Sequence, residues 1–167
     1  MSPSRRDDIR AQIVESTGID EAMIERLVHT FYDHIRDDAV LGPIFAERIS
    51  DWGPHLQTMC DFWSSVALMT GRFHGNPMEK HACLPIDARH FDRWLKLFEG
   101  TARTICPPEA ASFFIERAHR IAKSLELGIA MAHGKILGTG QRFIRDDVRV
   151  DYDRPTTKET PHEQSKR

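Results

Sequence analysis

The sequence lacks the features that mark several protein classes. Its 167 residues include only three cysteines, at positions 60, 83 and 106 and without CxxC spacing, which argues against a disulfide framework or a thiolate metal site. The formal net charge is only -2, so we expect no strong attraction to nucleic acid or anionic lipid. No apolar run approaches the ~18 residues that span a membrane, and none follows the basic residues near the N-terminus, so we expect no secretory signal. Together with the length, these absences predict a single cytoplasmic domain.

Familiar catalytic and cofactor motifs are also missing. The chain has no HExxH, paired ExxH or Cys/His cluster, so zinc hydrolase and di-iron sites lack the ligand spacing that they need. It has no GxSxG, Walker or GxGxxG loop, and no CxxCH motif for covalent c-type haem attachment. Because no flavin or nicotinamide motif is present, any redox activity would need electrons from a separate protein.

The two ends of the chain differ in composition from its middle. Residues 1–16 are charged and contain few large apolar side chains, and the end of the chain is dense in charge and then in Thr, Pro, Glu and Lys. Such stretches bury too little apolar surface to offset the entropy lost on ordering them. We therefore predict a flexible N-terminal extension over residues 1–16, a folded domain over 17–137 and a mostly disordered tail over 138–167.

The predicted domain shows helical periodicity, with no alternating β-branched run that would indicate a sheet. Asp20 is a candidate N-cap, and apolar residues then recur every three or four positions over about four turns. Asp37-Asp38 and Gly42-Pro43 are expected to break this helix. Further helices are expected after Ser50-Asp51, after Asp87 and after Pro107-Pro108, with a short proline-bracketed segment over 77–85. The sequence thus predicts an all-α fold.

Three side chains on these predicted helices are candidates for a binding site. His55 lies on the apolar stripe of its helix, Tyr32 flanks the stripe of the first helix, and Trp94 lies on the apolar face of another. A buried imidazole, hydroxyl or indole N–H needs a hydrogen-bond partner. From spacing alone, however, a core or boundary role is favoured for each of them.

Nine histidines slightly favour a metal or haem site, because neutral imidazole is a common ligand. His81 lies in the short proline-bracketed segment, where a ligand could face a cavity between longer helices. The same position is equally compatible with an exposed loop histidine that binds nothing. His90, His119 and His133 lie on or beside helices as well. Periodicity does not choose the ligand among these four.

Taken together, several strings resemble the truncated haemoglobins, and more narrowly their third group. The resemblance covers about residues 17–133, and the order and spacing of the strings make it more specific than any one of them. The strings are Phe31-Tyr32 followed by Leu41-Gly-Pro-Ile-Phe45, Trp52-Gly-Pro-His55 running on to Phe62-Trp63, residues 77–85 (PMEKHACLP) and residues 90–98 (HFDRWLKLF).

This resemblance implies a truncated globin, in which a two-over-two helical sandwich surrounds one non-covalent haem b. His81 matches the proximal ligand of the iron, bound through Nε2. The polar distal residues that would face a bound gas are Tyr32, His55 and Trp94. The apolar residues implied to line the haem are Phe45, Met59 and Phe91.

The implied function is reversible binding of O₂, CO and NO at a five-coordinate iron, by a protein that is a monomer or weak dimer. Several distal donors would slow the release of O₂, which suits redox chemistry better than oxygen delivery. The alternative is therefore an NO dioxygenase or peroxidase that uses a separate reductase. A remote alternative is a haem-free helical interaction module whose tails bind a partner.

Two local features bear on this interpretation. Gly53-Pro54 directly precedes His55, so the start of the distal helix is expected to be irregular, and His55 would then swing in or out as a gate. His90 lies close in sequence to the implied haem-lining residue Phe91, so it would compete for iron or bind a haem propionate.

Overall fold

The computed structural model describes residues 4–150, and within them the chain forms α-helices and no β-strand. The predicted all-α fold is therefore confirmed. The helices are α1 (Arg5–Thr17), α2 (Glu21–Asp37), α3 (Leu41–Arg48), α4 (Trp52–Leu68), α5 (Pro77–His81), α6 (Ala88–Ile105) and α7 (Pro108–Ala132). None of them is both long enough and apolar enough to cross a membrane.

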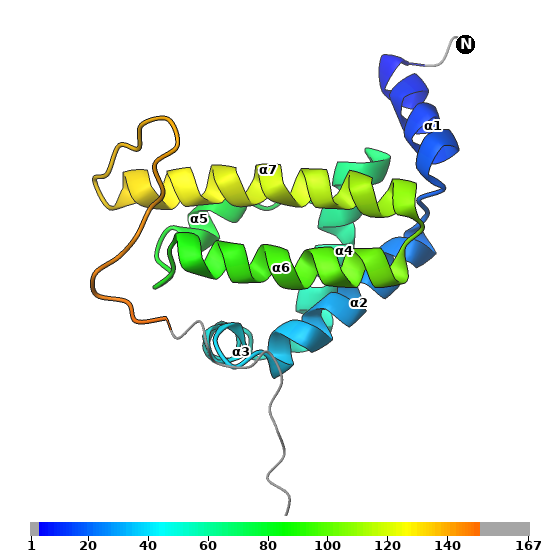
Figure 1. Cartoon of the computed structure of the whole chain (residues 1–167). Helices are drawn as coiled ribbons and strands as arrows, with labels where there is room; N and C mark the ends of the chain where they lie inside the picture. Colours follow the sequence, from blue (N-terminus) through cyan, green and yellow to red (C-terminus); the bar gives the residue numbers. More distant parts are fainter. Residues whose placement is uncertain (1–3, 151–167) are drawn as a thin grey trace, which may run out of the picture.

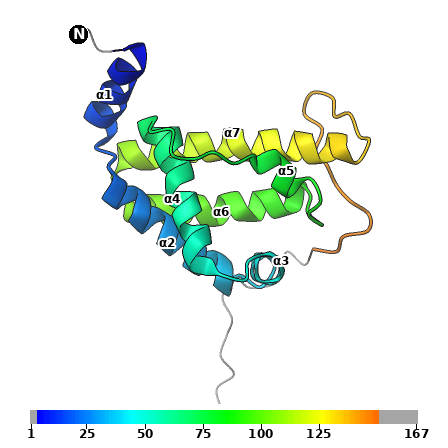
Figure 2. The same cartoon turned by 180° about the vertical axis from the view of Figure 1, so that it is seen from behind.

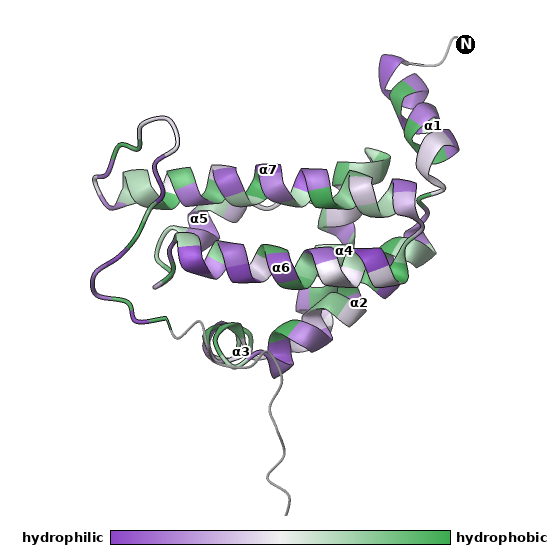
Figure 3. Cartoon of the chain, viewed as in Figure 1, coloured by the Kyte–Doolittle hydropathy of each residue, from purple (hydrophilic) through white to green (hydrophobic). Residues whose placement is uncertain are grey.

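Two pairs of helices form the body of the protein. The first pair is α6 and α7, which lie side by side along their length (Figure 1). The second is α2 and α4, which pack against each other, while α2 also contacts α6 and joins the two pairs (Figure 2). Hydrophobic and hydrophilic residues alternate along α6 and α7, as expected for helices with one face in the core (Figure 3).

The predicted helix starts at Asp20, Asp51 and Asp87 are confirmed. Each of these aspartates has extended backbone geometry, and its side chain accepts a backbone N–H of the following first turn. The three donor–acceptor distances lie between 2.8 and 3.2 Å. These caps fix where α2, α4 and α6 begin, and therefore the rotational position of every side chain that follows.

Buried apolar side chains form two clusters. The main core lies between α2, α4, α6 and the first half of α7, and it includes Phe31, Trp63, Phe98 and Phe114. The second, which we call the end cluster, lies where α6 begins and α7 ends. Its buried members are Ile86, Phe91, Ala122, Leu125, Ile129, Ala130 and Phe143.

The break expected after the first long helix is present, because α2 ends at Asp37 and Asp38 is extended. Gly42 and Pro43 lie beyond this break in the first turn of a new helix, α3, where proline lacks only an N–H that has no helical partner. A Cβ on Gly42 would lie 2.7 Å from the backbone oxygen of Arg36. The glycine is therefore needed because α3 begins in close contact with the last turn of α2.

The N-terminal residues are more ordered than the sequence suggested. Residues 5–17 form α1, which begins with a capping box between Ser4 and Asp7 and contacts α4 and α7. No residue of α1 is buried, and Arg6 donates a hydrogen bond to the Met69 carbonyl oxygen. Local capping and the Arg6 hydrogen bond hold this helix. Neither depends on large apolar side chains, whose scarcity was the reason for expecting flexibility.

The chain after α7 also departs from the expected disorder. Phe143 is 4% exposed and belongs to the end cluster, and Arg142 pairs with Glu126 on α7 at 2.9 Å. One buried aromatic ring and specific ion pairs order this stretch despite its high charge. Residues 151–167 lie outside the described residues, and the expected domain boundaries at 17 and 137 stay predictions.

Candidate functional site

Tyr32 and His55 come together where α2 meets α4. Their ring centroids are 5.1 Å apart and the rings are nearly perpendicular, at 89°. Tyr32 lies on the buried face of α2, whereas His55 lies in the first turn of α4 and is half-buried. The structure thus unites two of the three residues that the resemblance assigned to the distal site.

The Nε2 atom of His55 is buried and has no hydrogen-bond partner among residues 4–150. Buried polar atoms nearly always have partners, so one that lacks a protein partner points to a ligand, ion or water. Burial lowers the pKa of the His55 imidazole, and the charge of Lys80 lowers it further. The ring is therefore neutral at pH 7 and carries one N–H donor and one lone pair.

The Tyr32 hydroxyl is suited to donate a hydrogen bond. Burial raises the pKa of Tyr32 well above its usual value, because the phenolate would lose its solvation. The side chain therefore stays protonated across the physiological pH range. The rings of Trp52 and Phe45 lie beside that of Tyr32, with centroids 6.0 and 5.9 Å from its own, so the Tyr32 ring packs among aromatic groups.

Trp94, the third predicted distal residue, reaches this group through Phe31. The Phe31 ring lies 5.0 Å from that of Tyr32 and 5.2 Å from that of Trp94, with edge-to-face geometry in both cases. Trp94 also stacks on Phe98 at 5.3 Å and is half-buried. These aromatic contacts orient the indole. They agree with the predicted position of Trp94 on the apolar face of its helix.

His81 ends the five-residue helix α5. Its Nδ1 lies 2.6 Å from the backbone oxygen of Pro77, a carbonyl that can only accept. Nδ1 therefore carries the proton, and the lone pair of the neutral ring is on Nε2. This is the form in which histidine binds a metal, with the other nitrogen oriented by a hydrogen bond.

Two of the other three candidate histidines, His90 and His119, are engaged differently from His81. His90 is buried, and its Nδ1 accepts the backbone N–H of Asp87 at 3.1 Å, so in the neutral ring the proton lies on Nε2. Burial lowers the pKa of His90, although the neighbouring Asp87 opposes this. His119 pairs through its Nε2 with Glu99 on the surface. His133 places its Nδ1 2.9 Å from the backbone oxygen of Ile129, a contact like that of His81 with Pro77, and its ring lies against the end cluster. Hydrogen bonding therefore leaves Nε2 free in His81 and in His133, and His81 is the one of the two that the resemblance assigns to the iron.

The three predicted haem-lining residues lie in different surroundings. Phe45 lies beside Tyr32, Met59 packs against the main core while partly exposed, and Phe91 is buried in the end cluster. Trp52 was not predicted as a site residue, although its ring lies 5.7 Å from that of His55. Its position three residues before His55 was the available signal, because such residues share a helix face.

The comparison with known families decides the class of protein. A family model described as bacterial-like globin matches residues 12–126 of the 167-residue chain. The chain belongs to the bacterial-like globins. As a globin it is a haem protein, and its class of ligand is the diatomic gases.

The similar proteins support the narrower assignment to the third group of truncated haemoglobins. The "Group 3 truncated hemoglobin ctb" of Campylobacter jejuni is 33% identical over 113 residues, which is 65% of this globin and 89% of that protein. The crystal structure of the group III truncated hemoglobin from Campylobacter jejuni superimposes with a TM-score of 0.62 over the same shares. A hemoglobin from Thermobifida fusca (22% identity, 68% of this chain and 95% of its own, TM-score 0.57) supports the fold alone. The resemblance predicted from sequence is confirmed.

The residues present fit a haem group. His81 has an imidazole oriented by a hydrogen bond at Nδ1, with Nε2 free to bind a metal, and the buried His55 Nε2 atom has no partner among residues 4–150. Histidine is the proximal ligand typical of globins. These side chains therefore match the cofactor that the family implies, and the haem-free interaction module predicted as a remote alternative has no support.

Proposed function

We propose that this globin reversibly binds O₂, and also CO and NO, at a non-covalent haem b held by Nε2 of His81. When bound, haem supplies an iron atom with one coordination position open to a diatomic ligand. The observation that carries the proposal is the buried His55 Nε2 atom, which has no partner among residues 4–150. The His55 ring lies 5.1 Å from the ring of Tyr32, whose hydroxyl is protonated. Such a pair is suited to a small polar ligand.

The distal side chains would favour O₂ by donating hydrogen bonds. Tyr32 offers an O–H, Trp94 an indole N–H, and neutral His55 an N–H in one tautomer. O₂ takes on negative character when it binds, so it gains more from these donors than CO does. Each such bond contributes about 1–3 kcal/mol away from water, or roughly 5- to 150-fold in the rate of release.

Redox catalysis is the alternative function for the same residues. An NO dioxygenase or peroxidase that takes electrons from a separate reductase stays a prediction, because residues 4–150 show no feature that distinguishes it from gas binding.

The direct test is the absorption spectrum of the purified protein. After addition of haemin we expect a red protein with a Soret band, and after reduction with dithionite we expect that band to shift under CO. As a control for non-specific porphyrin binding, the apoprotein is titrated in parallel with iron-free protoporphyrin IX. The iron-free complex has no metal to bind CO, so its spectrum should not shift. A protein that stays colourless with haemin would contradict the proposal.

The role of Tyr32 is tested by Tyr32→Phe. We expect O₂ release to become about 5- to 150-fold faster, because one donor to the ligand is lost, while CO release changes much less. Stopped-flow displacement of O₂ by CO measures the first rate. The matched control is Tyr152→Phe, at the only other tyrosine of the chain. Equal O₂ release by wild type and Tyr32→Phe would remove Tyr32 from the distal set.

A further inference from the structure

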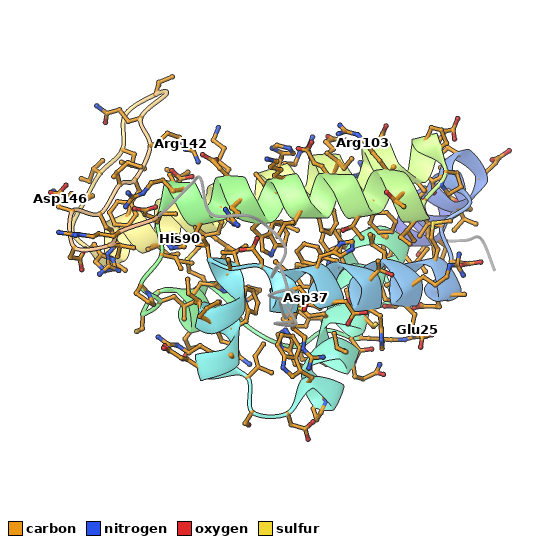
Figure 4. All side chains as sticks on the ribbon, turned by 60° about the horizontal axis from the view of Figure 1, so that its bottom comes forward. Glu25, Asp37, His90, Arg103, Arg142 and Asp146 are labelled. Atoms are coloured by element: carbon orange, nitrogen blue, oxygen red, sulfur yellow. The ribbon has the colours of Figure 1, made fainter. Side chains whose placement is uncertain are left out.

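A segment that follows α7 returns to the region next to His81. We call residues 138–148 the C-terminal strap. The strap runs from the end of α7 back past the start of α6 (Figure 1), and Figure 4 shows Arg142 and Asp146 at the same end of the molecule as His90. It lies outside residues 12–126, which match the globin family.

The first half of the strap is anchored on α6 and α7. The Arg142 guanidinium donates to the carboxylates of Glu126, at 2.9 Å, and Asp92, at 2.8 Å, and these acids raise the pKa of the arginine further. Phe143 inserts its side chain into the end cluster, and its carbonyl oxygen accepts the N–H of Ala88 at 2.8 Å. Burial of the ring and two ion pairs therefore fix the strap where α6 begins.

Arg145 then connects the strap to the loop between α5 and α6. Its Nη1 donates to the backbone oxygen of Leu84 at 3.2 Å, and its backbone N–H donates to the Asp87 carboxylate at 3.0 Å. Asp147 holds the same guanidinium from the solvent side, with an Nη2–Oδ2 distance of 2.7 Å. The Arg145 side chain is only 16% exposed, so it is held between the loop and the strap.

This loop begins directly after His81. The Leu84 N–H donates to the His81 backbone oxygen at 3.0 Å, so two hydrogen bonds join Arg145 to the backbone of the histidine. Helix α5 has only five residues, too few to be stable alone, and therefore depends on its surroundings. On one side Met78 of α5 packs against Gly128 of α7, so closely that a Cβ on Gly128 would lie 2.0 Å from the Met78 sulfur. On the other side the loop is held by the strap.

We propose that Arg145 is a positioning residue for His81. The strap orders the loop that follows the histidine and thereby fixes the direction in which its Nε2 points. The proposal rests on the proposed function, because it assigns His81 as the ligand of haem iron. Its consequence is that residues outside the family-matched region control how firmly this globin holds its cofactor.

The test compares Arg145→Ala with Arg149→Ala, since Arg149 is an exposed arginine four residues further along the chain. In the apoprotein, hydrogen exchange should accelerate in residues 82–90 of Arg145→Ala but not in α2. In the haem-loaded protein, Arg145→Ala should transfer haem to an apomyoglobin acceptor about tenfold faster than wild type. Loss of a residue that supports a metal ligand typically weakens binding by about 10- to 100-fold, and the lower value is expected here. The iron–histidine stretching band of the ferrous protein should shift or broaden. Arg149→Ala should match wild type in all three measurements.

Arg145→Lys separates positioning from folding, because a lysine keeps the charge and can still donate to the Leu84 carbonyl. We expect its haem transfer rate to fall between those of wild type and Arg145→Ala. If wild type binds haem but Arg145→Ala transfers it at the wild-type rate with an unchanged stretching band, the role of Arg145 is overturned and the proposed function stands. If wild type itself takes up no haemin, the proposed function fails, and this assignment fails with it.

Discussion

Replacing His81 by glycine is expected to abolish tight haem retention, and added imidazole is expected to restore it. The substitution removes the imidazole that the Pro77 carbonyl orients and leaves a space of the same shape. Because losing an outer partner alone costs about 10- to 100-fold in metal affinity, we expect loss of the ligand itself to weaken haem binding by more than about 100-fold. Haem transfer to apomyoglobin, followed at the Soret band with and without imidazole, measures both effects.

The matched variant for this experiment is His90→Asn. Asparagine can replace the Nδ1 acceptor through its Oδ1 atom and so preserve the bond to the Asp87 N–H, while it removes the ring. We expect this variant to retain haem like wild type. Haem retained by His81→Gly but lost from His90→Asn would transfer the ligand role to His90, the competitor that the sequence left open.

Much of this fold follows from local patterns in the sequence. The starts of α2, α4 and α6 were predictable because an N-cap aspartate acts within one turn of the chain. The order of α1 and of the C-terminal strap was not predictable from apolar content, because Arg6 and Arg145 make bonds to residues that are distant in sequence. Long-range ion pairs and bonds to loop carbonyls leave no periodic signal.

The candidate site divides in the same way. His55 was visible as a polar residue on an apolar stripe, and the predicted proximity of Tyr32 and His55 is met by the structure. The tautomer of His81 was not predictable, since it depends on the distance between its Nδ1 atom and the Pro77 oxygen. Spacing can thus nominate a histidine, but a hydrogen-bond partner is needed to say which nitrogen is free to bind a metal.

The largest expected loss of stability comes from Asp38, the residue that follows α2. Its carboxylate is fully buried and accepts from Arg93 Nε at 2.8 and 2.9 Å, and also from the N–H groups of Val40 and Leu41 at 3.0 and 2.8 Å. One side chain therefore joins the turn between α2 and α3 to α6. Removing one partner of a buried ion pair typically costs about 3–5 kcal/mol, so we expect Asp38→Ala to lower the free energy of unfolding by about that amount.

Asp37→Ala is the matched control, because Asp37 is the preceding residue, carries the same charge and is exposed. Exposed substitutions of this kind usually change stability by less than about 0.5 kcal/mol. Urea denaturation of the apoprotein, followed by helical circular dichroism, measures both variants without a contribution from haem. If Asp38→Ala and Asp37→Ala unfold at the same urea concentration, the pair between Asp38 and Arg93 does not hold α6 against the turn after α2. The stability of that contact would then come from the aromatic packing of Phe31, Trp94 and Phe98 alone.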